Sequence, residues 1–283
     1  IYTCYVLTAT RKLTGIVSIR EILLANEKDI IKDLMETNMI SVITTEDQEE
    51  VAKTFDKYDL YALPVVDNEH RLVGIITVDD AINVIQDETS EDFEKMAAIT
   101  PNEEGYFQTS VFKHTKNRIV WLLVLMLSAA ITGSIITNYE AAFQVVPILV
   151  AFIPMIMDTG GNCGAQSSTL IIRGLATDEI VLKDVLKVLW KEIRVAVLVG
   201  ILLATINGIR IFFQYKELNI AITVGLTLIV TVLLAKVLGC LLPIIAKKLK
   251  LDPAIMASPL ITTLVDTFSI LVYFQIATAV IGL

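Results

Sequence analysis

Five long apolar stretches between residues 119 and 282 constrain the fold more than any other feature of the sequence. A helix needs about 20 apolar residues to cross the roughly 30 Å hydrocarbon core of a bilayer. The five stretches are close to that length or longer, and hydrophobic residues make up 54% of the whole chain. The sequence therefore predicts an α-helical polytopic membrane bundle with spans at 119–137, 141–172, 195–213, 220–245 and 254–282.

Basic residues are distributed unevenly among the segments that flank these spans. Lys and Arg are frequent before the first span, between the second and third, and between the fourth and fifth. The opposite loops hold Lys216, and Arg210 stands near the end of the third span. Because cytoplasmic loops carry an excess of Lys and Arg, we expect a multi-pass protein of the cell (inner) membrane with its N-terminal region inside and its C-terminus outside.

The segment that precedes the spans differs from them in charge. Residues 1–105 carry 9 Lys and Arg against 22 Asp and Glu, whereas residues 106–283 carry 14 against 9. An acidic soluble region repels nucleic acid and attracts cations, so no nucleic-acid partner is expected. Cys4, Cys163 and Cys240 lie far apart and form no CxxC pair, so neither a disulfide framework nor a zinc site is indicated.

A repeat with an offset of 59 residues relates LTGIVSIREI at 13–22 to LVGIITVDDA at 72–81. In the second copy an amphipathic segment, DQEEVAKTFDKYDL, precedes two apolar strands and a helix that opens at Asp79 or Asp80. The order helix, strand, strand, helix resembles the α/β CBS module, which occurs in pairs and often binds adenine nucleotides.

The resemblance to CBS modules implies how the soluble region is divided. We expect the C-terminal half of a first module at 1–27 and a complete second module at 28–86. Thr77 and Asp80 match the phosphate and ribose positions of the module. Whether ATP or another adenine nucleotide binds there is left open, because the first module lacks its opening half.

Residues 87–117 follow as an acidic connecting helix, resembling a plug, and its linker to the transmembrane pore domain at 118–283. We expect Ser90 to cap this helix, with Glu91 and Asp92 in its first turn.

Asp266 is the most informative single residue, because it lies about a dozen residues inside the fifth span. A charge at that depth costs about 2.5–3.5 kcal/mol on insertion scales, so it usually faces a water-filled path or a partner. Ser, Thr and Tyr residues at helical spacing extend the polar stripe, and they are also the residue types that join membrane helices. The stripe comprises Ser258, Thr262, Thr263, Ser269 and Tyr273.

The second span is unusual because its middle reads PMIMDTGGNCGAQ at 154–166. Proline and three glycines weaken a helix, so we expect irregular backbone here, which is tolerated where it lines a cavity. Asp158, Asn162 and Gln166 recur every four residues and share one face. Carboxylate, amide and hydroxyl oxygens suit Mg²⁺ or Ca²⁺ better than Zn²⁺ or Cu⁺.

The CBS region, the acidic helix, GGNxGxQ in the second span and TTxVD in the fifth together resemble MgtE magnesium channels. The resemblance implies a homodimer in lipid whose pore takes up Mg²⁺ down its electrochemical gradient. It implies that Asp266 holds a largely hydrated Mg²⁺ in the pore. Together with the oxygen-bearing positions of the second and fifth spans, the predicted pore residues are Asp266, Asn162, Asp158, Thr262, Thr263 and Gly161.

The resemblance also implies that the pore closes when cytosolic Mg²⁺ is high, through metal ions that bridge acidic groups. The corresponding residues here are Glu88, Glu91, Asp92, Glu94 and Asp252. Asp252 before Pro253 is also a good helix N-cap. No part of the sequence matches the family's further N-terminal helical domain, so we expect a piece of a longer protein.

Two other functions are consistent with the residues. A proton- or sodium-coupled divalent-cation carrier would use Asp266 and Asp158 as a relay, and its flux would follow the coupling gradient. A membrane magnesium or nucleotide sensor would transport nothing. The sequence shows no nucleophile and base pair, so we do not expect an enzyme.

Overall fold

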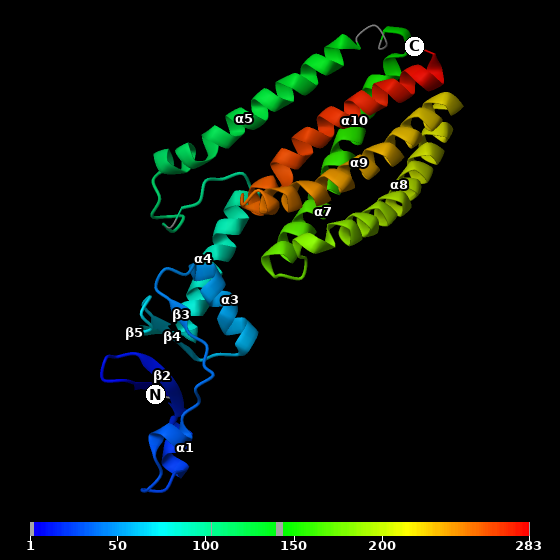
Figure 1. Cartoon of the computed structure of the whole chain (residues 1–283). Helices are drawn as coiled ribbons and strands as arrows, with labels where there is room; N and C mark the ends of the chain where they lie inside the picture. The colour runs from blue at the N-terminus through cyan, green and yellow to red at the C-terminus, as the bar shows by residue number, and fades with distance from the viewer. Residues whose placement is uncertain (1–2, 103, 140–143, 283) are drawn as a thin grey trace. The chain divides into compact units, whose positions relative to one another are not determined.

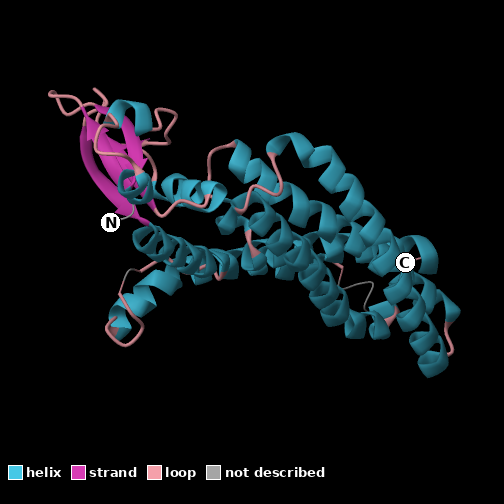
Figure 2. Cartoon of the chain, turned by 90° about the horizontal axis from the view of Figure 1, so that it is seen from below, coloured by secondary structure: helices cyan, strands magenta, loops and turns pink. Residues whose placement is uncertain are grey.

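The computed structural model describes residues 3–102, 104–139 and 144–282. The chain divides into two compact units, Ile1–Ser90 and Glu91–Leu283. All named strands belong to the first unit, and the second is built of helices (Figure 2).

The first unit opens with an antiparallel pair of strands. Strand β1 pairs with β2 through a register that runs from Thr3 opposite Ser18 to Leu7 opposite Leu13. The bounds are β1 Thr3–Leu7, β2 Leu13–Ser18, α1 Ile19–Leu24 and α2 Ile31–Leu34.

The remainder of the first unit has the expected order of helix, strand, strand and helix, with a short parallel strand added. Strand β4 pairs with β3 in parallel and with β5 antiparallel. Helix α3 buries Val51, Ala52 and Phe55, which recur at helical spacing in the sequence. The bounds are β3 Val42–Ile43, α3 Gln48–Tyr58, β4 Ala62–Val66, β5 Leu72–Thr77 and α4 Val78–Met96.

Helix α4 corrects the expectation of a separate helix that begins at Ser90. It runs without a break from Val78 to Met96, and Ser90 lies in its interior. The Ser90 hydroxyl donates 2.8 Å to the carbonyl of Gln86, one turn earlier. An N-cap side chain bonds a free backbone N–H, and the continuous helix leaves none at this position.

Among its described residues, the second unit contains five helices that are long and apolar enough to cross a membrane, which confirms the predicted membrane bundle. Three of them extend at both ends beyond the predicted apolar spans, because helical backbone continues into the polar residues that flank them. The second, Pro147–Ala176, begins later than the predicted residue 141, and the fifth, Pro253–Ile281, ends one residue before the predicted end. The bounds are α5 Val111–Asn138, η1 Pro147–Phe152, α7 Ile153–Ala176, η2 Leu182–Asp184, α8 Val185–Tyr215, α9 Leu218–Lys248, η3 Pro253–Met256 and α10 Ser258–Ile281.

Helix α9 lies at the centre of this bundle, where it packs against α7, α8 and α10 (Figure 1). Helix α5 packs against α10, and a hydrogen bond of 2.8 Å joins the hydroxyls of Thr132 and Thr267 across that contact. Helices α7 and α10, which carry the candidate pore residues, therefore both rest on α9.

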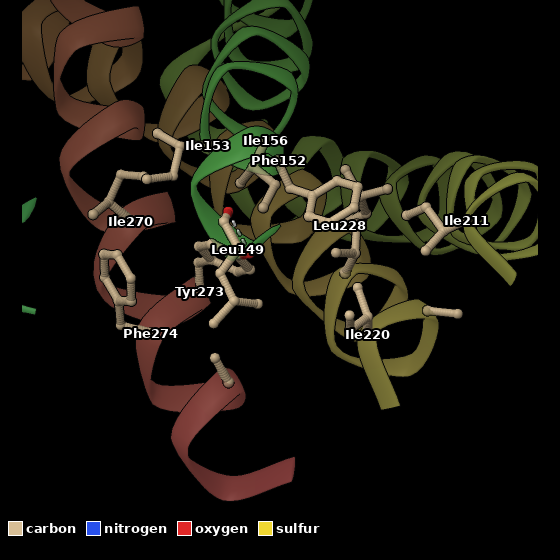
Figure 3. Packing of buried hydrophobic residues seen from close by; sticks show 13 residues of the cluster. Leu149, Phe152, Ile153, Ile156, Ile211, Ile220, Leu228, Ile270, Tyr273 and Phe274 are labelled. Carbon is tan, nitrogen blue, oxygen red and sulfur yellow. Dashed lines mark hydrogen bonds between the residues drawn. The ribbon is translucent and has the colours of Figure 1, made fainter. Parts of the chain in front are cut away.

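A buried hydrophobic cluster holds one end of the bundle together (Figure 3). It joins Leu149 and Phe152 of η1, Leu228 of α9, and Tyr273 and Phe274 of α10. The Tyr273 hydroxyl donates 2.8 Å to the carbonyl of Leu149, so the one polar group of that ring is satisfied inside the cluster. This contact fixes the segment that leads into α7.

Candidate functional site

Helix α7 carries a line of three polar side chains that we call the polar edge: Asp158, Asn162 and Gln166. All three are exposed in the single chain, although they lie within a candidate membrane span. Their spacing of four residues places them on one side of the helix, as the sequence predicts. They present one carboxylate and two amides in a row.

The opposite side of α7 is buried and rich in small residues, and it corrects the expectation of irregular backbone. The helix is continuous through GGNCG, and the 3₁₀ turn η1 precedes it. A Cβ added to Gly160 would lie 2.7 Å from Thr231 Cγ2, and one added to Gly164 would lie 2.7 Å from Ile261 Cγ2. These glycines let α9 and α10 approach closely, and that packing offsets their poor helix propensity.

Asp266 stands half-buried on α10, the neighbour of α7. It lies where α10 packs against the segment of α7 that follows Asp158: a Cβ added to Gly160 would lie 2.9 Å from Cγ1 of Val265, the residue before Asp266. The structure thus brings together the helix segments that carry the two intramembrane carboxylates singled out by the sequence. Two carboxylates at one place in a membrane bundle attract a cation strongly.

Three further residues predicted for the pore lie beside this pair. Gly161 is buried against Thr262, whose Cγ2 would be 3.0 Å from an added Cβ. The hydroxyls of Thr262 and Thr263 both donate to the carbonyl of Pro259, at 3.0 and 2.8 Å. Each hydroxyl oxygen keeps lone pairs with which it can accept from water or bind an ion.

The predicted polar stripe of the fifth span divides between two environments. Ser269 and Tyr273 are buried among the helices, whereas Thr262, Thr263 and Asp266 are only half-buried. Helix packing, the simpler explanation for Ser, Thr and Tyr, therefore accounts for Ser269 and Tyr273.

Among the predicted regulatory acids, Asp252 and Glu91 both pair with the ammonium group of Lys95. One Asp252 oxygen accepts 2.8 Å from the backbone N–H of Ala254, which confirms its role as an N-cap, here of η3. The other accepts 2.6 Å from the ammonium of Lys95, which also pairs with Glu91. Burial opposes the charge, but the hydrogen bonds to Asp252 and Glu91 raise the pKa of Lys95 well above its ordinary value.

Two of the other regulatory acids bond to groups outside this pair. Glu88 falls in the first unit, where it accepts 2.8 Å from the amide of Gln48. Glu94 accepts 2.9 Å from the backbone N–H of Asn102. Asp92 lies between them on α4. Within the described residues, no group of three or more His, Cys, Asp or Glu side chains is gathered as it would be around a metal ion.

Thr77 and Asp80 bond to each other at the start of α4. The hydroxyl and backbone N–H of Thr77 donate 2.7 and 3.0 Å to the same carboxylate oxygen of Asp80. These bonds lower the pKa of Asp80, the side-chain bond most. Ser18 and Glu21 repeat the arrangement at 2.8 and 2.9 Å, so the sequence repeat is also a structural one.

An apolar cavity of about 150 Å³ lies beside this turn in the first unit. Ile76 and Ala81, which flank the Thr77–Asp80 turn, line it, and Thr44, Glu46 and Gln48 supply its polar groups.

The buried ion pair between Lys236 and Glu192 is not predicted from the sequence. The ammonium of Lys236 on α9 lies 3.5 Å from the carboxylate of Glu192 on α8, and both side chains are largely buried. A lysine in the middle of an apolar helix is itself a signal of such a pair. The high hydropathy of the surrounding span concealed it.

Comparison with known families matches two parts of the chain. Residues 153–276 match the family model of MgtE, described as a divalent cation transporter. Residues 31–87 match the CBS domain.

Relatives match nearly the whole chain. The magnesium transporter MgtE of Bacillus subtilis is 38% identical over 98% of this chain and 61% of its own length. The magnesium transporter MgtE of Thermus thermophilus is 36% identical over the same shares. The chain thus spans about three-fifths of the length of these curated relatives.

A solved structure described as the soluble part of a magnesium transporter is also similar. It is 42% identical, covers 31% of this chain and 34% of its own, and has a TM-score of 0.31.

Proposed function

The chain belongs to the MgtE family, and from that premise we propose that it conducts Mg²⁺ through the membrane down its electrochemical gradient. The observation that carries the proposal is that α7 and α10, which carry Asp158 and Asp266, pack closely at these residues inside a bundle of apolar helices. Two carboxylates with neighbouring amide and hydroxyl oxygens form a hard, oxygen-rich site. Mg²⁺ prefers such ligands and dehydrates reluctantly, so it would pass with much of its water retained.

The exposure of the polar edge supports a path that a second copy of the chain completes. Asp158, Asn162 and Gln166 would face lipid if one chain stood alone, and a charge or amide in hydrocarbon is costly. A homodimer with this edge at its interface would cover it and place a second set of the same oxygens opposite the first. We therefore propose a pore between two subunits.

No coupling ion is needed for uptake by such a pore. A divalent cation gains about 4.6 kcal/mol per 100 mV of inside-negative potential, twice the single-charge value. The distribution of basic residues supports the corresponding orientation, with the CBS region cytoplasmic and the C-terminus outside.

The regulatory part of the proposal concerns cytosolic Mg²⁺. Asp252 follows α9 at the end that we assign to the cytoplasm, and Lys95 pairs with both Asp252 and Glu91. Mg²⁺ at high concentration would replace that ammonium and bridge the carboxylates, with closure of the pore as the result. This contact is therefore the place where we propose that Mg²⁺ controls the gate.

An adenine nucleotide is the ligand that we propose for the cavity of the first unit. Its apolar walls suit a flat ring, and the adjoining Thr77–Asp80 turn offers polar groups for ribose or phosphate. An ATP titration of the full chain, followed by thermal unfolding, tests this: wild type should gain stability and Ala81→Trp, which fills the cavity, should not.

The decisive experiment for transport is Mg²⁺ influx into proteoliposomes held inside-negative without a pH or sodium gradient. Wild type should conduct, and Asp266→Asn should lose most of the flux because it removes the charge and keeps the volume. Gln275→Ala is the matched control, since Gln275 is exposed on α10 and lies nine residues from Asp266, on the opposite side of the helix.

The same assay separates the alternatives. Influx that appears only after a pH or sodium gradient is imposed would identify a coupled carrier. No influx under either condition, with Mg²⁺ or ATP still changing the thermal stability, would favour a sensor.

A further inference from the structure

Three polar side chains from three helices meet inside the membrane bundle, and we call them the buried triad: Ser167 of α7, Glu192 of α8 and Lys236 of α9. Ser167 is fully buried and its hydroxyl donates 2.6 Å to Glu192. It accepts 3.0 Å from the ammonium of Lys236, which itself lies 3.5 Å from Glu192. Every member is therefore bonded to both others.

The position of Ser167 connects the triad with the candidate ion path. Ser167 directly follows Gln166, the last residue of the polar edge, and it faces the opposite, buried side of α7. The next residue, Ser168, is also buried and donates 2.9 Å to the carbonyl of Met256 in η3. Two adjacent serines thus attach the end of the polar edge to α8, α9 and η3.

The helix crossing beside the triad leaves α7 little freedom to adjust. A Cβ on Gly164, one turn before Ser167, would lie 3.3 Å from the carbonyl oxygen of Ala235, the residue before Lys236. Backbone therefore meets backbone at this crossing, with the triad immediately beside it. A small change in the triad would be passed to the helix as a whole, because packed backbones cannot absorb it by rotating side chains.

We propose that the buried triad positions the polar edge of α7 relative to Asp266 and so sets the ion specificity of the path. The inference deepens the proposed function and rests on it. A charge inside a membrane protein is costly unless paired, and an apolar pair of similar size would hold the helices at least as well. Hydrogen bonds and ion pairs require a particular geometry, whereas apolar contacts do not. The ionic triad therefore fixes how α7, α8 and α9 are aligned along one another, which an apolar pair would not do.

The test compares the double variant Lys236→Met/Glu192→Gln with wild type. The double variant removes both charges together, so it should remain folded with an unchanged melting temperature. Its half-saturating Mg²⁺ concentration, or its ratio of Mg²⁺ to Ca²⁺ influx, should change by about two- to thirty-fold, the range typical of residues that act through a packed network. Lys191→Met is the control, because Lys191 is an exposed lysine beside Glu192 and should alter neither quantity.

A second variant and a second measurement keep the test decisive if the double variant does not fold. Ser167→Ala removes only the hydroxyl that joins α7 to the ion pair, and it should shift the same quantities in the same direction. The placement of the polar edge is read without transport from the rate at which a thiol reagent labels the Asn162→Cys variant, with and without the triad substitution.

The outcomes separate the two proposals. Folded triad variants with wild-type half-saturation, influx ratio and labelling rate would overturn the positioning role. If the wild-type chain conducts no ion, the proposed function is overturned. If the triad substitutions still change the labelling rate of Asn162→Cys in that case, the positioning role is kept.

Discussion

Lys95 donates a hydrogen bond of 2.6 Å to Asp252, a residue 157 positions away, and pairs with Glu91 by the same ammonium. The chain thus places its own cation between two acids that we propose as ligands of regulatory Mg²⁺. A divalent ion that binds there must first displace this ammonium. Because the pKa of Lys95 is raised, the side chain stays charged throughout the neutral range.

Lys95→Met should make the gate more sensitive to cytosolic Mg²⁺. The two carboxylates would lose their internal competitor, so influx should be half-inhibited at a Mg²⁺ concentration about two- to fivefold lower, as befits a partly exposed ion pair worth up to about 1 kcal/mol. Internal Mg²⁺ is varied in proteoliposomes while external Mg²⁺ is fixed. Lys95→Arg keeps the charge and is the control. An unchanged midpoint in Lys95→Met would show that Mg²⁺ does not bind at this pair.

Gly164→Ala should destabilise the bundle by about 1–3 kcal/mol, the usual cost of overpacking. Its added methyl would lie 2.7 Å from Ile261 Cγ2, and the crossing with α9 leaves no space for it. The control is Gly133→Ala on α5, where an added Cβ meets nothing within 4 Å and alanine gains up to about 1 kcal/mol in helix propensity. Thermal unfolding in detergent measures both. Equal melting temperatures for the two variants would contradict the tight crossing.

Asp80→Asn should weaken the start of α4 at neutral pH and have little effect in acid. Hydrogen bonds from Thr77 lower the folded-state pKa of Asp80 below its ordinary 3.8. The stabilisation is therefore present above the unfolded pKa and is lost as pH falls through the folded pKa. Hydrogen exchange of the peptide over residues 72–82, corrected for intrinsic rates, should differ between wild type and variant at pH 7 and converge as pH falls through the folded-state pKa of Asp80.

Asp79→Asn is the control for this prediction, because it removes the same charge from the same turn. If Asp79→Asn and Asp80→Asn have equal effects, general helix-terminus electrostatics explains them and the bonds from Thr77 are unimportant.

The broad fold was predictable because its signals are periodic and local. Apolar runs of membrane length predict the five helices, and the 59-residue repeat predicts two copies of one motif, which begin their helices in the same way at Ser18 and Thr77. The continuity of α7 was not predictable from propensity. Its glycines are poor helix formers, and the close contacts with α9 and α10 that favour them there form only in the folded bundle.

The sequence predicts which residues form the candidate site better than it predicts which of them contact each other. The spacing of four residues identifies the polar edge, and Asp266 is conspicuous in its span. That Val265, beside Asp266, packs against Gly160 of α7, or that Asp252 bonds Lys95, depends on how distant helices pack. Lys236 carried the same intramembrane signal as Asp266, yet its role appears only with Glu192 and Ser167 beside it.

The effects of substitutions in the buried triad on the free energy of unfolding should be strongly non-additive. Lys236→Met alone leaves Glu192 without its charged partner, and Glu192→Gln alone leaves Lys236 without its charged partner. Each single substitution should lower the free energy of unfolding by about 3–5 kcal/mol, the usual penalty of an uncompensated buried charge. The double variant should lie close to wild type, because neither charge remains to be compensated. A double-mutant cycle measured by unfolding in detergent gives the coupling. If the two single losses simply add in the double variant, the side chains stabilise the bundle independently, and the ion pair is not what joins α8 to α9.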